Sequence, residues 1–134
     1  MSFIYKRTVY LADTDAAGVV YFAQALSICH EAYEASLVKA GIELKTFFNN
    51  PTVAVPVVQA HIDFLRPLLA GDRLLVTLSP RLLSDSEFGI TYHIVADSSP
   101  QQIVVKANTR HVCITLDRRR TAIPEALKQW LVLT

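Results

Sequence analysis

Two aspartates near the amino terminus, Asp13 and Asp15, are the residues of this chain best suited by type and position to do chemistry. A small Ala-Ala-Gly turn, residues 16–18, follows them and leads into a helical pattern. The first backbone N–H groups of a helix have no partner within the helix and carry the positive end of its dipole. Such groups can stabilise a carbonyl oxygen that becomes negative during a reaction. An acid beside this helix end therefore indicates acyl transfer.

The same two acids also fit a structural role, because Asp side chains commonly bond nearby backbone N–H groups in turns and helix caps. The D-x-D pattern followed by Gly imitates the start of a calcium loop, but its twelfth position would be Gln24 instead of a bidentate Glu. No metal site is predicted elsewhere. Cys29 and His30 are adjacent on the predicted helix and point apart, and the sequence has no C-x-x-C pair or H-E-x-x-H motif.

The elements around this junction follow from the spacing of apolar residues. Residues 3–11 alternate and are rich in Tyr, Val and Thr, which predicts a strand leading into the Asp-containing loop. From about Tyr21 to Ala40, apolar residues recur every three or four positions, which predicts one long helix that Gly41 ends as a cap. The predicted apolar face comprises Phe22, Ala25, Leu26, Cys29, Tyr33, Leu37 and Ala40.

The rest of the chain is mostly strand. A short helical turn is expected within residues 42–50, before the loop at Asn49-Asn50-Pro51. Four strands follow, over about 58–64, 73–83, 88–94 and 103–116, and a short helix is expected over 121–131 with Pro124 in its first turn. We interpret Phe47, Phe48 and Tyr92 as core residues. The pattern predicts an α+β fold in which an antiparallel sheet packs on one helix.

Composition limits the classes of function. The 134 residues fit a single domain, 1–134, and half of them are hydrophobic, so the surface is apolar enough to favour a homo-oligomer. A net charge of +1 gives no general attraction to nucleic acid or to acidic membranes. Two cysteines fit a reducing compartment, and no apolar signal core or membrane span is visible, so we expect a cytoplasmic protein.

The motif D-T-D-A-A-G-V-V-Y-F at residues 13–22, followed by the helix and by I-D-F-L-R-P at 62–67, resembles the 4-hydroxybenzoyl-CoA thioesterase branch of the hotdog-fold superfamily. The resemblance spans almost the whole chain. Within that branch, residues 9–15, 29–34 and 111–114 are most similar to the cyanobacterial 1,4-dihydroxy-2-naphthoyl-CoA hydrolases of phylloquinone synthesis. The resemblance implies a hotdog fold, with the antiparallel sheet wrapped around one long central helix.

This resemblance also implies roles for the residues of the motif. The catalytic carboxylate would be Asp15, acting as a nucleophile or as a general base on water, while Asp13 shapes the loop. The oxyanion donor would be the backbone N–H of Phe22. Gly18 and Val19 would lie at the substrate, and Gly18 would let the backbone approach the thioester closely. Attack on a thioester carbonyl needs only an ionised acid and an aimed N–H, so no metal or organic cofactor is expected.

Other positions bear on the substrate. Short-chain members of the branch have a His where this chain has Phe22 and a Tyr where it has Leu11, so the short-chain subgroup is disfavoured. Aryl-CoA members hold an acid at the position of His30, and we interpret His30 either as a ligand of a substrate hydroxyl or as a packed core histidine.

The cations proposed for the CoA phosphates are Lys106, Arg110 and Arg118. Arg118 belongs to the run Arg118-Arg119-Arg120, for which the alternative interpretation is a solvated, non-binding surface. His61, His93 and His111 have no evident partner and are interpreted as structural.

The expected function is hydrolysis of an aromatic acyl-CoA thioester, with 1,4-dihydroxy-2-naphthoyl-CoA as the first candidate substrate. The expected assembly is a dimer paired across sheet edges, then a tetramer, with each active site built from two subunits. An acyl-CoA thioesterase of other specificity remains an alternative. So does a non-catalytic module that binds acyl-CoA or an aromatic ligand, although such a module would not need Asp15. A hotdog dehydratase is disfavoured because it would need a His-led helix motif that is missing here.

Overall fold

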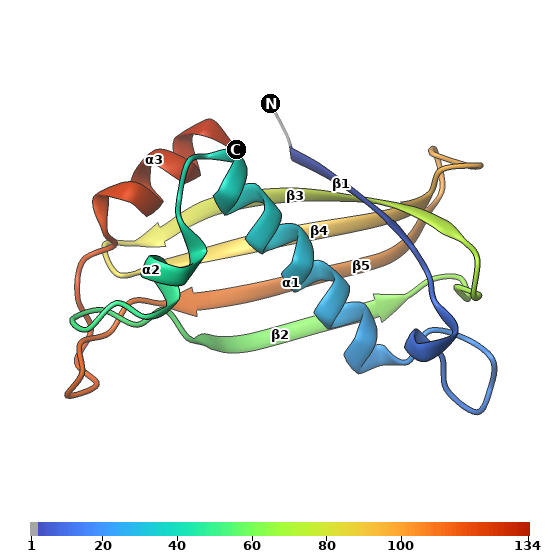
Figure 1. Cartoon of the computed structure of the whole chain (residues 1–134), viewed down its shortest axis with the longest axis horizontal. Coiled ribbons are helices and arrows are strands. Elements are labelled where there is room, and N and C mark those ends of the chain that lie inside the picture. Colours follow the sequence, from blue (N-terminus) through green and yellow to red (C-terminus); the bar gives the residue numbers. More distant parts are fainter. Residues whose placement is uncertain (1–2) are drawn as a thin grey trace.

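One five-stranded antiparallel sheet with a long helix across one face forms the framework of the computed structural model, which describes residues 3–134 (Figure 1). The spatial order of the strands is β1-β3-β4-β5-β2, so β1 and β2 are the edges. The strands are β1 (Phe3–Thr8), β2 (Val57–Phe64), β3 (Arg73–Ser84), β4 (Glu87–Ala96) and β5 (Ile103–Val112). The helices are α1 (Phe22–Lys39), α2 (Leu44–Phe48) and α3 (Glu125–Leu133), and a 3-10 helix, η1, covers Leu11–Asp13.

The long helix α1 lies where the sequence predicted it, with Tyr21 as its N-cap and Ala40 as its C-cap. Gly41 follows with φ of +89°, a left-handed conformation that suits glycine and stops the helix. The buried face differs in detail from the prediction, because it includes Ile28 and Ala32 while Phe22 is half exposed. The helix therefore buries its middle against the sheet and leaves its first residue free at the end of the domain.

The core between α1 and the sheet is aromatic at its centre. Tyr33 of α1, Phe88 of β4 and Trp130 of α3 are fully buried and lie edge-on or tilted to one another, with ring centroids 5.4 to 6.4 Å apart. The Trp130 Nε1–H donates to Ser36 Oγ of α1 at 2.9 Å, so the one polar atom of the indole is satisfied. These contacts fix α3 against the carboxyl-terminal half of α1 and leave the amino-terminal half to the site.

Strand β2 is an edge strand with both faces largely exposed. It pairs with β5 on one side only, and Ile62 is its most covered residue. Val57, Val58 and Phe64 are each between 39% and 48% exposed, although Val58 and Phe64 belong to the alternating apolar pattern that predicted this strand. The unpaired edge of β2 thus presents both free backbone groups and apolar side chains, which are the features to which another strand can pair.

Four predictions of local structure were wrong in their details. Strand β1 ends at Thr8 rather than at residue 11, because the Val9 N–H bonds Asp72 and η1 then turns the chain. Strand β5 ends at Val112, and Ile114 forms only isolated bridges beyond it. Pro124 is the extended N-cap of α3 rather than a residue of its first turn. Phe48 is 49% exposed, whereas Tyr92 is buried as predicted.

Candidate active site

The Asp15 loop is a tight, internally bonded turn between η1 and α1. The Asp15 N–H donates to Val19 O at 2.9 Å, and the Gly18 N–H donates back to Asp15 O at 3.0 Å. Gly18 has φ of +80°, which explains why the turn contains glycine. The Ala17 N–H donates to Asp15 Oδ1 at 2.8 Å, which orients the carboxylate while the residue stays exposed to solvent. The loop therefore presents an oriented and accessible acid.

The start of α1 supplies N–H donors beside this loop. The Tyr21 N–H is used, since it donates to Asp13 O at 3.0 Å. The first N–H with a partner inside the helix is that of Ala25, which donates to Tyr21 O. No acceptor among residues 3–134 takes the N–H groups of residues 22–24. The Phe22 N–H is thus free to meet a developing oxyanion.

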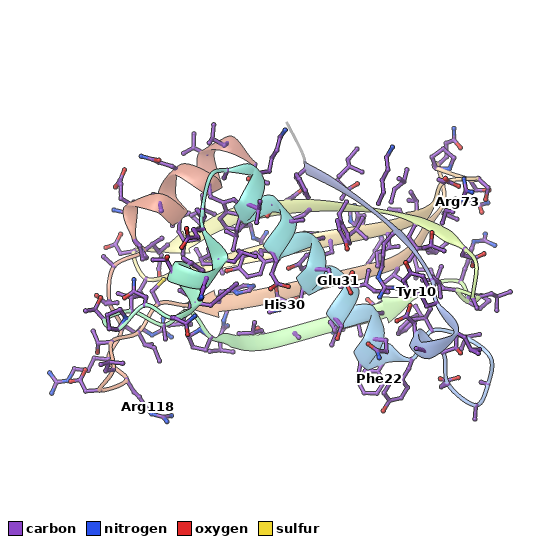
Figure 2. The ribbon with its side chains drawn as sticks, in the orientation of Figure 1. Tyr10, Phe22, His30, Glu31, Arg73 and Arg118 are labelled. Atoms are coloured by element: carbon purple, nitrogen blue, oxygen red, sulfur yellow. The ribbon has the colours of Figure 1, made fainter. Side chains whose placement is uncertain are left out.

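The Asp15 carboxylate and the start of α1 line one cavity of about 450 Å³. Asp15, residues 19–21 and the first helical residue, Phe22, line one side, and residues 64–68 line the other. The Val20 N–H donates to Leu68 O at 2.9 Å, so the two walls are joined at the base. Phe22 lies at the start of α1 (Figure 2). A thioester carbonyl in this cavity can meet the acid and the helix end together.

The cavity also contains Arg66, the one cation among its lining residues. This arginine belongs to the I-D-F-L-R-P motif, but no role was predicted for it from the sequence. Its neighbours are held in place, because the N–H groups of Leu65 and Arg66 both donate to Val104 O of β5. The motif itself was the signal that could have identified Arg66 as a site residue.

Asp13 has the structural surroundings expected of a residue that shapes the loop. It is 5% exposed, and its carboxylate accepts hydrogen bonds from the Arg7 guanidinium and the Tyr10 N–H. The hydrogen bond from Arg7 lowers the pKa of Asp13, so this acid stays ionised. Neither Arg7 nor its second carboxylate partner, Glu31 of α1, was predicted as a site residue, because the two are distant in the sequence.

His30 lies on the side of α1 that faces β5 and β2, about 12 Å along the helix from Phe22 (Figure 2). Its Nε2 is buried and has no hydrogen-bond partner among the described residues. The ring packs near Tyr33 and His111, at centroid distances of 5.5 and 6.3 Å. These contacts place the ring beside the aromatic centre of the core, and His30 is not among the residues that line the Asp15 cavity.

His111 lies behind His30 and is fully buried. Its Nε2 is 2.8 Å from Thr109 Oγ1, and its ring stacks on Phe88 at 4.7 Å. Burial, with a smaller contribution from His30, lowers the pKa of His111 to about 4, so this ring is neutral at pH 7. The structural interpretation of His111 is consistent with this environment. His61 is different, since its Nε2 lies 3.0 Å from Asp63 Oδ2 on the exposed strand β2.

Within a single chain, the three cations proposed for the CoA phosphates lie apart from one another. Lys106 is exposed on the outer face of β5, opposite Asp63. Arg110 lies in an ion pair with Glu87 at 2.8 Å, and Glu87 also binds Arg120. Arg118 lies at the opposite end of the molecule from Phe22 (Figure 2). None of the three lines the Asp15 cavity.

No group of three His, Cys, Asp or Glu within residues 3–134 is arranged to hold a metal ion. Over the same range, no helix is both long and apolar enough to cross a membrane.

Comparison with known proteins identifies the family. The family model described as the thioesterase-like superfamily matches residues 9–131. The chain belongs to this superfamily. Its fold is accordingly the hotdog fold, as predicted from the sequence, and the Asp15 cavity lies in a thioesterase domain.

Members of the superfamily with high identity to this chain share a name. A 1,4-dihydroxy-2-naphthoyl-CoA hydrolase from Rippkaea orientalis is 54% identical over 131 residues, which cover 97% of this chain and 95% of the relative. A protein of the same name from Gloeothece citriformis is 57% identical over 129 residues, with 96% and 90% covered. A crystal structure of a 1,4-dihydroxy-2-naphthoyl-CoA thioesterase from Synechocystis matches with a TM-score of 0.93 and 42% identity, covering 98% of this chain and 96% of that one.

Proposed function

We propose that this thioesterase hydrolyses 1,4-dihydroxy-2-naphthoyl-CoA to 1,4-dihydroxy-2-naphthoate and CoA, a step of phylloquinone synthesis. The observation that carries the proposal is the cavity that joins the Asp15 carboxylate to the free N–H groups at the start of α1. The names of the cyanobacterial relatives support this choice of acyl group. The reaction needs no group beyond water and these residues.

Asp15 acts on the thioester carbonyl in one of two ways. As a general base it takes a proton from water while the water oxygen bonds the carbonyl carbon. As a nucleophile its own oxygen bonds that carbon, and water then cleaves the resulting anhydride. In both cases the carbonyl oxygen becomes negative and is held by the Phe22 N–H. The C–S bond then breaks, and the CoA thiolate leaves and takes up a proton.

His30 binds a ring hydroxyl of the substrate in this proposal, and Gly18 and Val19 contact the thioester. The buried Nε2 of His30, which has no hydrogen-bond partner among the described residues, supports this role because a substrate hydroxyl would supply one. His30→Ala is expected to raise the Michaelis constant or lower the rate for hydroxylated aryl esters. Unchanged values for both would exclude His30 from substrate recognition.

The proposal includes an assembly, with one domain of residues 1–134 in each subunit. Two copies pair antiparallel through β2, whose apolar edge is exposed in the single chain. Such pairing sets the start of one β2 beside the end of the other, so Arg110 and Arg118 approach the Asp15 end of the partner. Lys106, Arg110 and Arg118 are proposed to meet the CoA phosphates in this shared site. Two dimers then form a tetramer, and the expected location is the cytoplasm.

The test is thiol release from a panel of aryl and short-chain acyl-CoA esters by the wild type and by Asp15→Asn. Loss of a catalytic base or nucleophile is expected to cost about 10²- to 10⁴-fold in rate. The dihydroxynaphthoyl ester should lead the panel, and the variant should keep its fold by circular dichroism. Turnover led by another ester would point to a thioesterase of other specificity. Absence of turnover, with retained binding of acyl-CoA, would favour the non-catalytic binding module.

A further inference from the structure

The Arg7 side chain is saturated with hydrogen bonds. Its Nε donates to Glu31 Oε1 at 2.8 Å, and NH2 donates to Glu31 Oε2 at 3.2 Å. NH1 donates to Asp13 Oδ2 and to Thr8 O, and NH2 also reaches Asp13 Oδ1 at 3.3 Å. A guanidinium has five N–H donors, and all five are used here. One side chain therefore holds two carboxylates from different segments.

The environment keeps this arrangement rigid. The side chain of Arg7 is 14% exposed and that of Asp13 7%. The Tyr10 ring lies 5.3 Å from the guanidinium carbon, and Tyr5 Oη donates to Glu31 Oε1 at 2.8 Å. Partly buried, bidentate arginine–carboxylate pairs are stronger and more directional than exposed ion pairs. Arg7 thus joins β1, η1 and α1 at one point.

Asp13 connects the Arg7 contacts to the residues proposed to react. Its backbone oxygen accepts the Tyr21 N–H at 3.0 Å, and Tyr21 immediately precedes Phe22. Two residues after Asp13, the Asp15 turn begins with its own bond to Val19. Glu31 is on the same helix as Phe22, about 13 Å further along. Arg7 therefore fixes both the loop that carries the acid and the helix that carries the N–H donor.

We propose that Arg7 is a positioning residue that sets the distance between the Asp15 carboxylate and the Phe22 N–H by tying the loop to α1 through Asp13 and Glu31. The proposal rests on the proposed hydrolase function. A displacement of about 1 Å at a reacting centre costs on the order of 10²-fold in rate, so loss of the tie should slow turnover without weakening substrate binding.

The first variant is Arg7→Met, which leaves two carboxylates without their shared cation and should lower both kcat and the melting temperature, Tm. The second is Arg7→Met combined with Asp13→Asn, which removes the unpaired buried charge while the Asn oxygen can still accept the Tyr10 N–H. This double variant should recover most of the Tm but keep a kcat about 10- to 100-fold below the wild type, with KM within about twofold. Arg81→Met is the control, because Arg81 lies on β3 with no carboxylate partner among the described residues.

A second measurement does not depend on turnover. Hydrogen exchange at the Tyr21 amide reports the bond to Asp13 O directly, and its protection should fall at least tenfold in the double variant. The Ile94 amide in the central strand β4 should keep its protection. Unchanged protection of the Tyr21 amide overturns the proposal for Arg7, whether or not any ester is hydrolysed. Absence of ester hydrolysis by the wild type would instead refute the hydrolase function.

Two kinetic results would also overturn the proposal. If the double variant regains both Tm and kcat, Arg7 serves stability alone. If KM rises while kcat holds, Arg7 acts on substrate binding rather than on the distance between the reacting groups.

Discussion

Replacing Phe22 by proline removes the proposed oxyanion donor while preserving the helix that carries it. Phe22 is the first residue of α1, the position at which proline is favoured because its missing N–H has no helical partner. Tyr21 has φ of −68° and ψ of 141°, the extended conformation that a residue before proline adopts. The backbone thus accepts a proline at the first position of α1, and the loss of hydrogen-bonding capacity is confined to one N–H.

The size of the effect follows from what is removed. Loss of a single oxyanion donor costs about 10²- to 10³-fold in kcat, or about 3 to 4 kcal/mol of transition-state stabilisation. Phe22→Ala is the matched control, because it keeps the N–H and removes a side chain that is already 53% exposed. We expect kcat of Phe22→Ala to fall less than about tenfold, well above that of Phe22→Pro.

The assay is release of free thiol from the dihydroxynaphthoyl ester at saturating substrate. Far-UV circular dichroism and Tm confirm that α1 persists in both variants, and Asp15→Asn marks the rate without the acid. A kcat for Phe22→Pro within about threefold of that for Phe22→Ala would refute the oxyanion assignment. The donor would then have to be sought at Ala23 or Gln24, whose N–H groups are also free of acceptors in residues 3–134.

Two further predictions concern stability. Burial lowers the pKa of His111 from 6.5 to about 4, so the unfolded chain takes up this proton at a higher pH than the folded chain does. The free energy of unfolding should therefore be unaffected by His111 above pH 6.5 and fall by about 2 kcal/mol at pH 5. Urea unfolding at fixed protein concentration should show this loss, and the same loss in His111→Gln would contradict the assignment to His111. Gly18→Ala should lower stability by about 1 to 2 kcal/mol and slow turnover, because φ at Gly18 is +80°. Gly41→Ala is the control, because φ at Gly41 is +89° at the far end of α1, and it should lower Tm by a similar amount but leave kcat unchanged. An equal loss of kcat in Gly18→Ala and Gly41→Ala would contradict a role of Gly18 at the substrate.

The part of the site that sequence could predict is the part that is contiguous in the chain. Asp15, Gly18 and Phe22 lie within one short segment, so spacing alone placed an acid next to a helix end, and the structure puts both in one cavity. The extent of α1 was equally local, since its period and its Gly41 cap are set by consecutive residues.

What sequence could not predict depends on the packing of distant segments. Arg7 reaches Glu31 only because β1 runs beside α1, and Arg110 meets Glu87 only because β4 pairs with β5. The register of the sheet decides such pairs, and no short pattern encodes it. In the same way, the exposure of Phe48 and of β2 follows from which surfaces α1 and α2 leave uncovered.

The open edge of β2 has a consequence for folding in a crowded solution. A row of unpaired backbone groups flanked by Val58 and Phe64 will accept any complementary strand, including an extended segment of a misfolded neighbour. If β2 pairs as in the proposed dimer, correct pairing of a newly folded chain competes with aggregation through the same edge, and the outcome depends on concentration and time. A peptide copying residues 57–64 should bind this edge during refolding and trap single subunits, whereas the same peptide methylated on its backbone nitrogens should not.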